Sequence, residues 1–276
     1  LQLAAAMDQS SIYVLVHLPK CGGRSAFKAF KQIFGEDKVL DLYTNLFEDE
    51  KENDLIAAFN NKTLDLSKYK AICGGHIDFD SNRDCFQDRK PLYVTLVREP
   101  LERFVSYFNY LSMADEESKE LPGRFPSSNP ELVAMAKSCK DIEEFYHRLL
   151  QGGDAEWQTS NIQSMFITGH KDCSVEKVID CLEHGFHLAM PLPLIDRFCA
   201  RIAAENGVRA QLAPHENFSI KRATGTDIKP EFHTLFSTRA ELDYVAYYYV
   251  WAKCLNEENR RLRDRRWLFN GWPRLI

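Results

Sequence analysis

The feature that most constrains this chain lies near its start, where an apolar run leads into a turn that carries glycines and cations. Residues 12–16 are apolar, residues 17–25 read His-Leu-Pro-Lys-Cys-Gly-Gly-Arg-Ser, and a helix-forming stretch follows. A strand, a loop and a helix start in that order are typical of an α/β protein. The unpaired N–H groups and positive dipole of a helix start attract anions, and glycines let the backbone approach an oxyanion closely. The sequence therefore predicts an anion-binding loop around Lys20, Gly22 and Gly23.

This loop differs from the standard mononucleotide loop, which has the pattern G-x-x-x-x-G-K-[ST]. Here Lys20 precedes the two glycines, and Arg24 and Ser25 follow them. A Gly-Gly turn after a strand is also common in α/β proteins as a plain connection to the next helix. Lys20 and Ser25 on either side favour the binding interpretation.

A second segment has the same organisation. Residues 91–97 form an apolar run that ends in Arg98, and Pro100 opens a stretch with helical apolar spacing. Proline suits the first helical turn because it lacks an N–H that would be unpaired there. Ligands of open parallel sheets bind beyond the carboxyl ends of the strands. We therefore expect Lys20 and Arg98 to lie at one edge of the sheet, where one anionic ligand could bridge them.

Together these two segments resemble a known family. Residues 17–25 resemble the 5′-phosphosulfate loop, and residues 97–108 the 3′-phosphate motif, of sulfotransferases that use 3′-phosphoadenosine 5′-phosphosulfate (PAPS). The resemblance is densest over residues 12–111 and is greatest for the carbohydrate branch that includes heparan sulfate 2-O- and 6-O-sulfotransferases. Shorter matches lie at Gly74–His76, Asn161–Gln163, Asn217–Arg222 and Glu241–Tyr244.

The resemblance implies an α/β fold, P-loop-like and three-layered, with a central, mainly parallel sheet flanked by helices. It also implies PAPS as co-substrate, with no metal. The donor-binding residues it points to are Lys20, Cys21, Gly22, Gly23, Arg24, Ser25, Arg98, Ser106 and Arg222. Cys21 departs from the family, which commonly has a small hydroxyl residue there. A thiol is a poor donor, so any role of Cys21 falls to its backbone N–H, and redox sensitivity becomes conceivable.

Sulfuryl transfer needs a cation at the leaving phosphate and a base at the acceptor oxygen. Lys20 is the expected cation and His76 the expected base, since a histidine with a pKa of about 6.5 can take a proton near neutrality. The alternatives are a structural role for His76, competition from His17, and assistance or replacement by Asp78 or Asp80.

The acceptor is expected to be a hydroxyl compound, with a glycan or glycolipid favoured by the resemblance. Asn161 and Gln163 lie in a segment that resembles a family stretch near the acceptor pocket, and His76 would also contact the acceptor. Amides suit sugar hydroxyls because they both donate and accept hydrogen bonds. The alternative is that these amides only cap a following helix.

Composition agrees with one α/β domain over residues 1–276, with a surface insertion at 115–130. The chain has 276 residues, of which 45% are hydrophobic, and a net charge of −5. That charge argues against general nucleic-acid binding. The basic run Arg260–Arg266 could attract a polyanion, but cations at the end of a solvated helix account for it more simply.

The chain lacks the run of about 18 apolar residues that a membrane span requires. Its eight cysteines form no C-x-x-C pair, so a zinc site is not expected. We expect a cytoplasmic enzyme, with a Golgi-lumenal catalytic domain as the alternative. Oligomeric state cannot be inferred.

The apolar periodicity predicts strands near residues 12–17, 71–74, 92–97 and 186–190. It predicts helices near residues 24–34, 101–112, 141–150, 193–206 and 240–262. A PAPS-dependent sulfotransferase explains both cationic strand ends and His76. A nucleotide kinase is the competing enzyme class, but the chain lacks the Walker spacing and a clear Asp pair for magnesium. A non-catalytic glycan- or anion-binding protein of the same fold is the third possibility.

Overall fold

A central five-stranded sheet organises the protein. The computed structural model describes residues 10–42, 55, 57–74, 78–79, 83–113, 130–152, 156–209 and 228–269. The described strands are all parallel and are ordered β2-β3-β1-β4-β5. Their bounds are β1 Ser11–Val16, β2 Val39–Asp41, β3 Ala71–Gly74, β4 Lys90–Val97 and β5 Phe186–Pro191. The expected α/β fold with a parallel sheet is confirmed.

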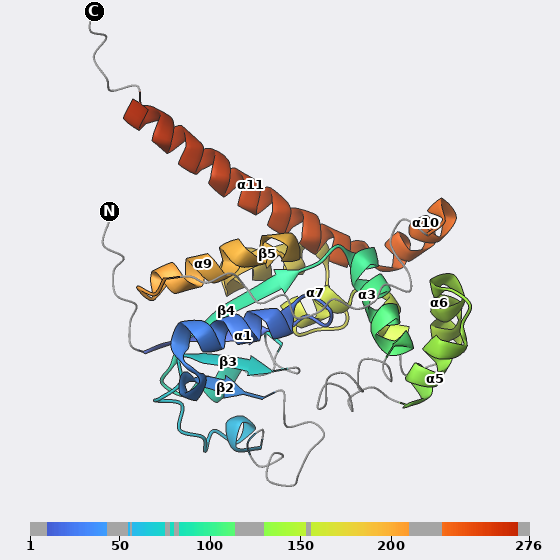
Figure 1. Ribbon diagram of the computed structural model, residues 1–276, viewed down its shortest axis with the longest axis horizontal. Coiled ribbons are helices and arrows are strands. Elements are labelled where there is room, and N and C mark those ends of the chain that lie inside the picture. Colours follow the sequence, from blue (N-terminus) through green and yellow to red (C-terminus); the bar gives the residue numbers. More distant parts are fainter. Residues whose placement is uncertain are drawn as a thin grey trace, which may run out of the picture.

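Helices cover both faces of this sheet (Figure 1). The α-helices in the described residues are α1 Gly23–Phe34, α3 Pro100–Ser112, α5 Pro130–Ser138, α6 Ile142–Gln151, α7 Ile162–Thr168, α8 Val175–Asp180, α9 Ile195–Glu205, α10 Pro230–Arg239 and α11 Glu241–Phe269. Helix α11 passes beside β5, and its C-terminal half extends beyond the rest of the fold (Figure 1). Among the residues described, no helix is both long enough and apolar enough to cross a membrane.

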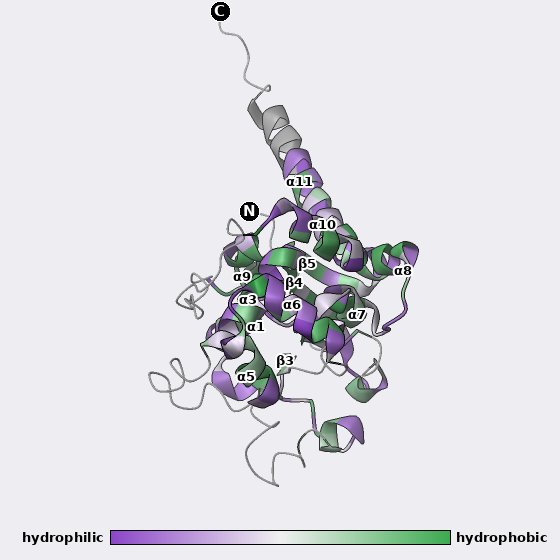
Figure 2. Ribbon diagram, turned by 90° about the vertical axis from the view of Figure 1, so that its right-hand side faces the viewer, coloured by the Kyte–Doolittle hydropathy of each residue, from purple (hydrophilic) through white to green (hydrophobic). Residues whose placement is uncertain are grey.

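Strand β1 shows why the fold has three layers. Its six residues are all buried. Ile12 and Val14 belong to a cluster with residues of α7, α8 and α11, whereas Tyr13 and Leu15 belong to one with residues of α1 and α9. Successive side chains of a strand point to opposite faces, so a strand covered on both faces reads as a continuous apolar run. Figure 2 shows the same arrangement, with green strands at the centre and purple on the outward faces of the helices.

A third hydrophobic cluster lies outside the sheet layers. It joins α3, α5, α6 and α10, which gather at one end of the molecule (Figure 1). Its fully buried aromatic residues are Phe104, Phe108, Phe145, Tyr146 and Phe236. Phe104 packs against Phe145, Tyr146 and Phe236 at centroid distances of 5.3–6.0 Å. This cluster anchors α3, the helix that follows Arg98.

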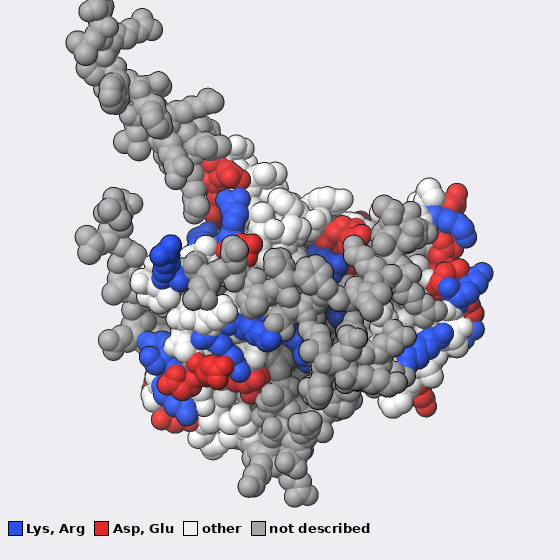
Figure 3. Space-filling model, viewed as in Figure 1, with Lys and Arg blue, Asp and Glu red and all other residues white. Residues whose placement is uncertain are grey.

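Every predicted strand and helix is present. The observed bounds lie within two residues of the predicted ones, except at the end of α11. Helix α11 runs seven residues beyond its predicted end at 262. Among the strands and α-helices, β2, α5, α8 and α10 were not predicted, and α7 was foreseen only in the alternative interpretation of Asn161 and Gln163. The expected insertion at 115–130 lies outside the described residues except for Pro130, where α5 begins. In the described part of the face in Figure 3, acidic and basic residues are interspersed.

A carboxylate ties α9 to two strands. Glu205 Oε2 accepts a hydrogen bond of 2.8 Å from Tyr13 Oη and lies 2.8 Å from His187 Nε2. Arg201 Nε donates to Glu205 Oε1 at 3.3 Å. Burial disfavours the carboxylate, but the contacts with His187, Tyr13 and Arg201 outweigh it and lower the pKa of Glu205 to about 2.

Glu205→Gln should lower the free energy of unfolding by about 1–2 kcal/mol at neutral pH. The folded pKa is below the ordinary value, so the stabilisation is complete above about pH 4.5 and is lost as the pH falls towards 2. Urea unfolding at several pH values should therefore show a weaker acid dependence in Glu205→Gln than in the parent. Glu258→Gln removes an exposed ion pair to Arg197 and should change stability by about 0.5 kcal/mol or less. An unchanged acid dependence in Glu205→Gln would contradict the assignment.

Candidate functional site

The loop after β1 is a tight turn with two left-handed residues. The backbone N–H of Cys21 donates to Leu18 O at 3.1 Å, which closes the turn. Lys20 has φ of 65° and Gly22 has φ of 81°. Glycine adopts this conformation without strain, whereas lysine does so at a cost. A Cβ at position 22 would also lie 2.4 Å from Leu192 Cδ1, so both conformation and space require glycine there.

Gly23 opens α1 and contacts the side chain of His17. A Cβ on Gly23 would lie 1.8 Å from His17 Cδ2, so only glycine lets this ring pack against the helix start. This position agrees with a packing role for His17. The sequence had suggested Gly23 as a site of close anion approach, and the packing of His17 is a second reason for a glycine.

The first turn of α1 has donors that the helix itself does not use. Its first intrahelical bond runs from Ala26 N to Gly22 O at 3.0 Å. The N–H groups of Gly23, Arg24 and Ser25 precede that bond, so they have no acceptor within α1. Arg24 is exposed and Ser25 is buried. The helix start therefore directs backbone donors towards the carboxyl edge of the sheet.

Arg98 brings the end of β4 to this same loop. Its Nη1 donates to Lys20 O at 3.2 Å, and its Nη2 lies 3.8 Å from Glu102 Oε2. Strands β1 and β4 are neighbours in the sheet, and the chain leaves them towards opposite sides, so this edge is a topological switch point. The prediction that Lys20 and Arg98 lie at one edge of the sheet is confirmed. Glu99 caps α3 by accepting from Glu102 N at 2.6 Å, with Pro100 as the first helical residue.

Gln163 joins the two loops from inside the protein. Its side-chain Oε1 accepts from Arg98 N at 2.9 Å and from Cys21 Sγ at 3.3 Å. Its Nε2 donates to Arg98 O at 2.8 Å. Gln163 is 1% exposed. The side chain is thus fully engaged within the protein, and the expectation that it contacts an acceptor is not supported by its position.

Asn161 has a comparable internal role. Its Oδ1 accepts from Leu242 N at 2.9 Å and from Asp243 N at 3.3 Å, so it caps α11 and not the helix that follows it, α7. The Asp243 carboxylate accepts in return from Gln163 N at 3.0 Å and Ser164 N at 2.7 Å. The two helix starts therefore cap each other. A direct acceptor contact by Asn161 is likewise unsupported.

Two buried charges lie behind the loops. Arg103 is 0% exposed, and its Nη1 donates to Gln158 Oε1 at 3.1 Å and its Nη2 to Gln158 O at 2.5 Å. Burial raises the pKa of Asp243 to about 6, while the backbone donors and Arg103 act in the opposite direction. Burial lowers the pKa of Arg103, which Asp243 in turn raises. Neither residue was predicted as part of the site from the sequence, although a charged residue on the apolar side of α3, one turn before Tyr107, is a signal for Arg103.

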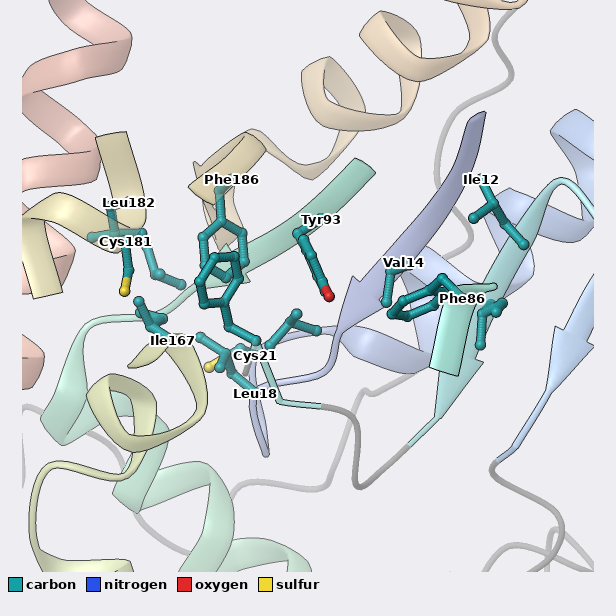
Figure 4. Packing of buried hydrophobic residues seen from close by; sticks show 14 of the residues in the cluster. Ile12, Val14, Leu18, Cys21, Phe86, Tyr93, Ile167, Cys181, Leu182 and Phe186 are labelled. Carbon is teal, nitrogen blue, oxygen red and sulfur yellow. The ribbon is translucent and has the colours of Figure 1, made fainter. Parts of the chain in front are cut away.

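The Cys21 side chain points into the hydrophobic cluster beside Leu18 and Ile167 (Figure 4). It is 1% exposed, and burial raises the pKa of its thiol to about 12. Both the thiol and the backbone N–H of Cys21 donate hydrogen bonds within the protein. The PAPS-binding site proposed below therefore does not include this residue. The eight cysteines are all described and all free. Redox sensitivity of Cys21 is not supported, because a buried protonated thiol is inert.

The remaining candidates are placed only in part. Ser106 is half-buried on α3. His76, Asp80 and Arg222 lie outside the described residues, whereas Asp78 is described and half-buried. Strand β3 ends at Gly74 opposite Val16 of β1, so the chain leaves β3 at the edge that carries the Lys20 loop.

The fold and this edge define a parallel α/β protein in which two neighbouring strands end in cationic residues that contact each other. No protein-family model matches the chain. The chain is similar to heparan sulfate 2-O-sulfotransferase hst-2 of Caenorhabditis elegans, with 25% identity over 166 residues. The matched region covers 58% of this chain and 47% of that protein, so the chain spans about half the length of the curated relative it matches.

Gln163→Leu should lower the free energy of unfolding by about 2–4 kcal/mol, because it leaves the N–H and C=O of Arg98 without their partners. Gln151→Leu is the matched control, since Gln151 is exposed at the end of α6, and it should change stability by about 0.5 kcal/mol or less. Urea unfolding of both variants measures the difference. Equal effects would show that the Gln163 bonds contribute little.

Cys21 should resist alkylation in the native protein. Iodoacetamide at pH 8 should leave it unmodified, because the thiol is buried and its pKa is about 12. The half-buried Cys173 and Cys254 should react faster. Peptide mass spectrometry before and after denaturation measures each site. Rapid native labelling of Cys21 would show that the loop opens.

Proposed function

We propose that this chain is a PAPS-dependent sulfotransferase that transfers a sulfuryl group to a hydroxyl acceptor. The observation that carries the proposal is the contact of Arg98 Nη1 with Lys20 O at 3.2 Å, because it joins the two segments that would grip opposite ends of one donor. The similarity to a heparan sulfate 2-O-sulfotransferase supports a sulfotransferase activity.

The loop end of the site would hold the 5′-phosphosulfate. The backbone N–H groups of Gly22, Gly23, Arg24 and Ser25, together with the Ser25 hydroxyl, would bind the phosphate oxygens at the positive end of α1. Lys20 would lie at the oxygen between phosphorus and sulfur. An ammonium there stabilises the negative charge that develops as the phosphate leaves.

The strand β4 end would hold the 3′-phosphate. Arg98 uses Nη1 on Lys20 O, and a guanidinium has five N–H donors in a planar fork, so further donors can serve a phosphate. Ser106 follows on α3 and would add its hydroxyl. Arg222, in the chain between α9 and α10, is proposed as a further ligand of the nucleotide.

The transfer would be in line. The acceptor oxygen forms a bond to sulfur as the bond from sulfur to the phosphate oxygen breaks, and a base takes the proton of the acceptor hydroxyl. We propose His76 as that base, because it follows β3 by two residues and β3 ends beside the Lys20 loop. The products are the sulfated acceptor and 3′-phosphoadenosine 5′-phosphate (PAP).

A glycan or glycolipid is the acceptor class we propose, because the curated relative is named for heparan sulfate. The first experiment combines labelled PAPS with a panel of glycans, glycolipids and small alcohols, and measures PAP binding by calorimetry in the presence of EDTA. Sulfation of a panel member and metal-independent PAP binding are expected. Magnesium-dependent ATP binding without PAP binding would instead support a kinase. PAP binding without turnover of PAPS would support a non-catalytic binding protein of the same fold.

Lys20→Ala should reduce PAPS turnover by about 100- to 1000-fold, the usual effect of removing one donor to a developing anion. Its Kd for PAP should rise by a much smaller factor, because the backbone donors of α1 remain. Calorimetry and a turnover assay on the same preparations separate the two effects. Near-normal turnover would remove Lys20 from the mechanism.

Arg98→Ala should instead raise the Kd for PAP by about 10- to 100-fold, as expected for loss of a charge-assisted phosphate contact. Arg197→Ala is the matched control, because Arg197 is an exposed arginine of α9 paired with Glu258. PAP should bind that variant like the parent protein. An unchanged Kd in Arg98→Ala would contradict the 3′-phosphate assignment.

A further inference from the structure

We propose that Tyr110 is a positioning residue that holds the Lys20 ammonium at the bond-breaking end of the site. This inference rests on the proposed function and deepens it. The Lys20 Nζ lies over the Tyr110 ring, 3.9 Å from the centroid. Cations within about 6 Å of an aromatic ring centroid are attracted by its negative face. The contact is therefore well inside the range of a cation–π interaction.

Tyr110 projects from the helix that would also bind the 3′-phosphate. It follows Ser106 by four residues on α3, so the two side chains lie on one face of that helix, one turn apart. The aromatic cluster around Phe104 and Phe145 fixes α3 against its neighbours. The ring under Lys20 is thus attached to the same rigid element as Ser106.

The backbone of Lys20 is fixed as well. Its φ of 65° is in the left-handed region, and its carbonyl oxygen accepts from Arg98 Nη1. Arg98 in turn is held through its own backbone by Gln163 at 2.9 and 2.8 Å. With the carbonyl held on one side, the ring of Tyr110 contacts the other end of the long lysine side chain and helps to place its ammonium group.

An aromatic ring suits this task because it is neutral. A carboxylate in its place would also orient the ammonium, but its negative charge would cancel the lysine charge and repel an anionic donor. The face of a tyrosine attracts the cation through its quadrupole and leaves the positive charge available.

The test uses reactions that need no acceptor. Release of sulfate from PAPS to water is measured together with the Kd for PAP in the parent, Tyr110→Phe and Tyr110→Leu proteins. Tyr110→Leu should slow release by about 5- to 30-fold, the factor that corresponds to a cation–π interaction. The Kd for PAP should stay within about threefold. Tyr110→Phe keeps the ring face and should restore most of the rate, and Tyr248→Leu, at an exposed tyrosine of α11, is the unrelated control.

A second readout does not depend on chemistry. In protein labelled on lysine with ¹³C, the ring current of residue 110 should shift the Lys20 ε-methylene signal upfield, and Lys20→Arg identifies that signal. The shift should persist in Tyr110→Phe and disappear in Tyr110→Leu. Its absence from the parent protein overturns the proposal, as does parent-like release in Tyr110→Leu or equal impairment in both variants.

If Tyr110→Leu does not fold, phenylalanine analogues with an increasing number of fluorine atoms are placed at position 110. They keep the shape of the ring and reduce the negative potential of its face. Release should slow with each added fluorine, and a flat response overturns the proposal. If the parent neither binds PAP nor releases sulfate, the sulfotransferase assignment fails, and the proposed role of Tyr110 fails with it. The ring-current signal still distinguishes that result from a missing contact.

Discussion

The arrangement of the two cationic loops depends on one buried amide. Gln163 accepts from Arg98 N and donates to Arg98 O, and it also accepts from the Cys21 thiol. These bonds connect the end of β4 with the loop after β1. A buried amide with all of its hydrogen bonds formed adds only modestly to the free energy of unfolding. Leaving buried groups without their hydrogen-bond partners lowers that free energy much more. The spacing between the two loops is therefore set from the interior.

The interior that fixes Gln163 is itself polar and charged. Asp243 accepts from the N–H groups of Gln163 and Ser164, and Asn161 caps the start of α11 in return. Burial raises the pKa of Asp243, so its ionised form depends on these donors and on the buried Arg103 nearby. An apolar replacement of a buried pair of charges is often no less stable, so stability alone does not account for this pair. Asp243 does join α11 to the start of α7, and Arg103 joins α3 to Gln158 in the segment before α7.

Much of the fold could be predicted from the sequence because its signals are local. The apolar run of β1 indicates a strand covered on both faces, and Pro100 marks a helix start. The meeting of Lys20 with Arg98 follows from parallel topology, since carboxyl ends of neighbouring strands share an edge. Short elements escaped prediction because periodicity needs length, and β2, α8 and α7 have only three, six and seven residues. Helix α10 does carry sequence signals, namely Pro230 at its start and the four-residue spacing of Phe232 and Phe236.

The internal roles of Gln163 and Asn161 could not be predicted, for a different reason. An amide at a helix start has the same sequence pattern whether it faces solvent or the interior, and its partners here lie 65 to 142 positions away. Only the fold brings them together. The consequence extends to the candidate site, because the carbonyl of the left-handed Lys20 is held by Arg98, and the backbone of Arg98 is held by Gln163. A displacement of the Arg98 guanidinium by a bound phosphate would therefore also be transmitted to the carbonyl of Lys20, since the bond from Arg98 Nη1 to Lys20 O joins the two ends of the site directly.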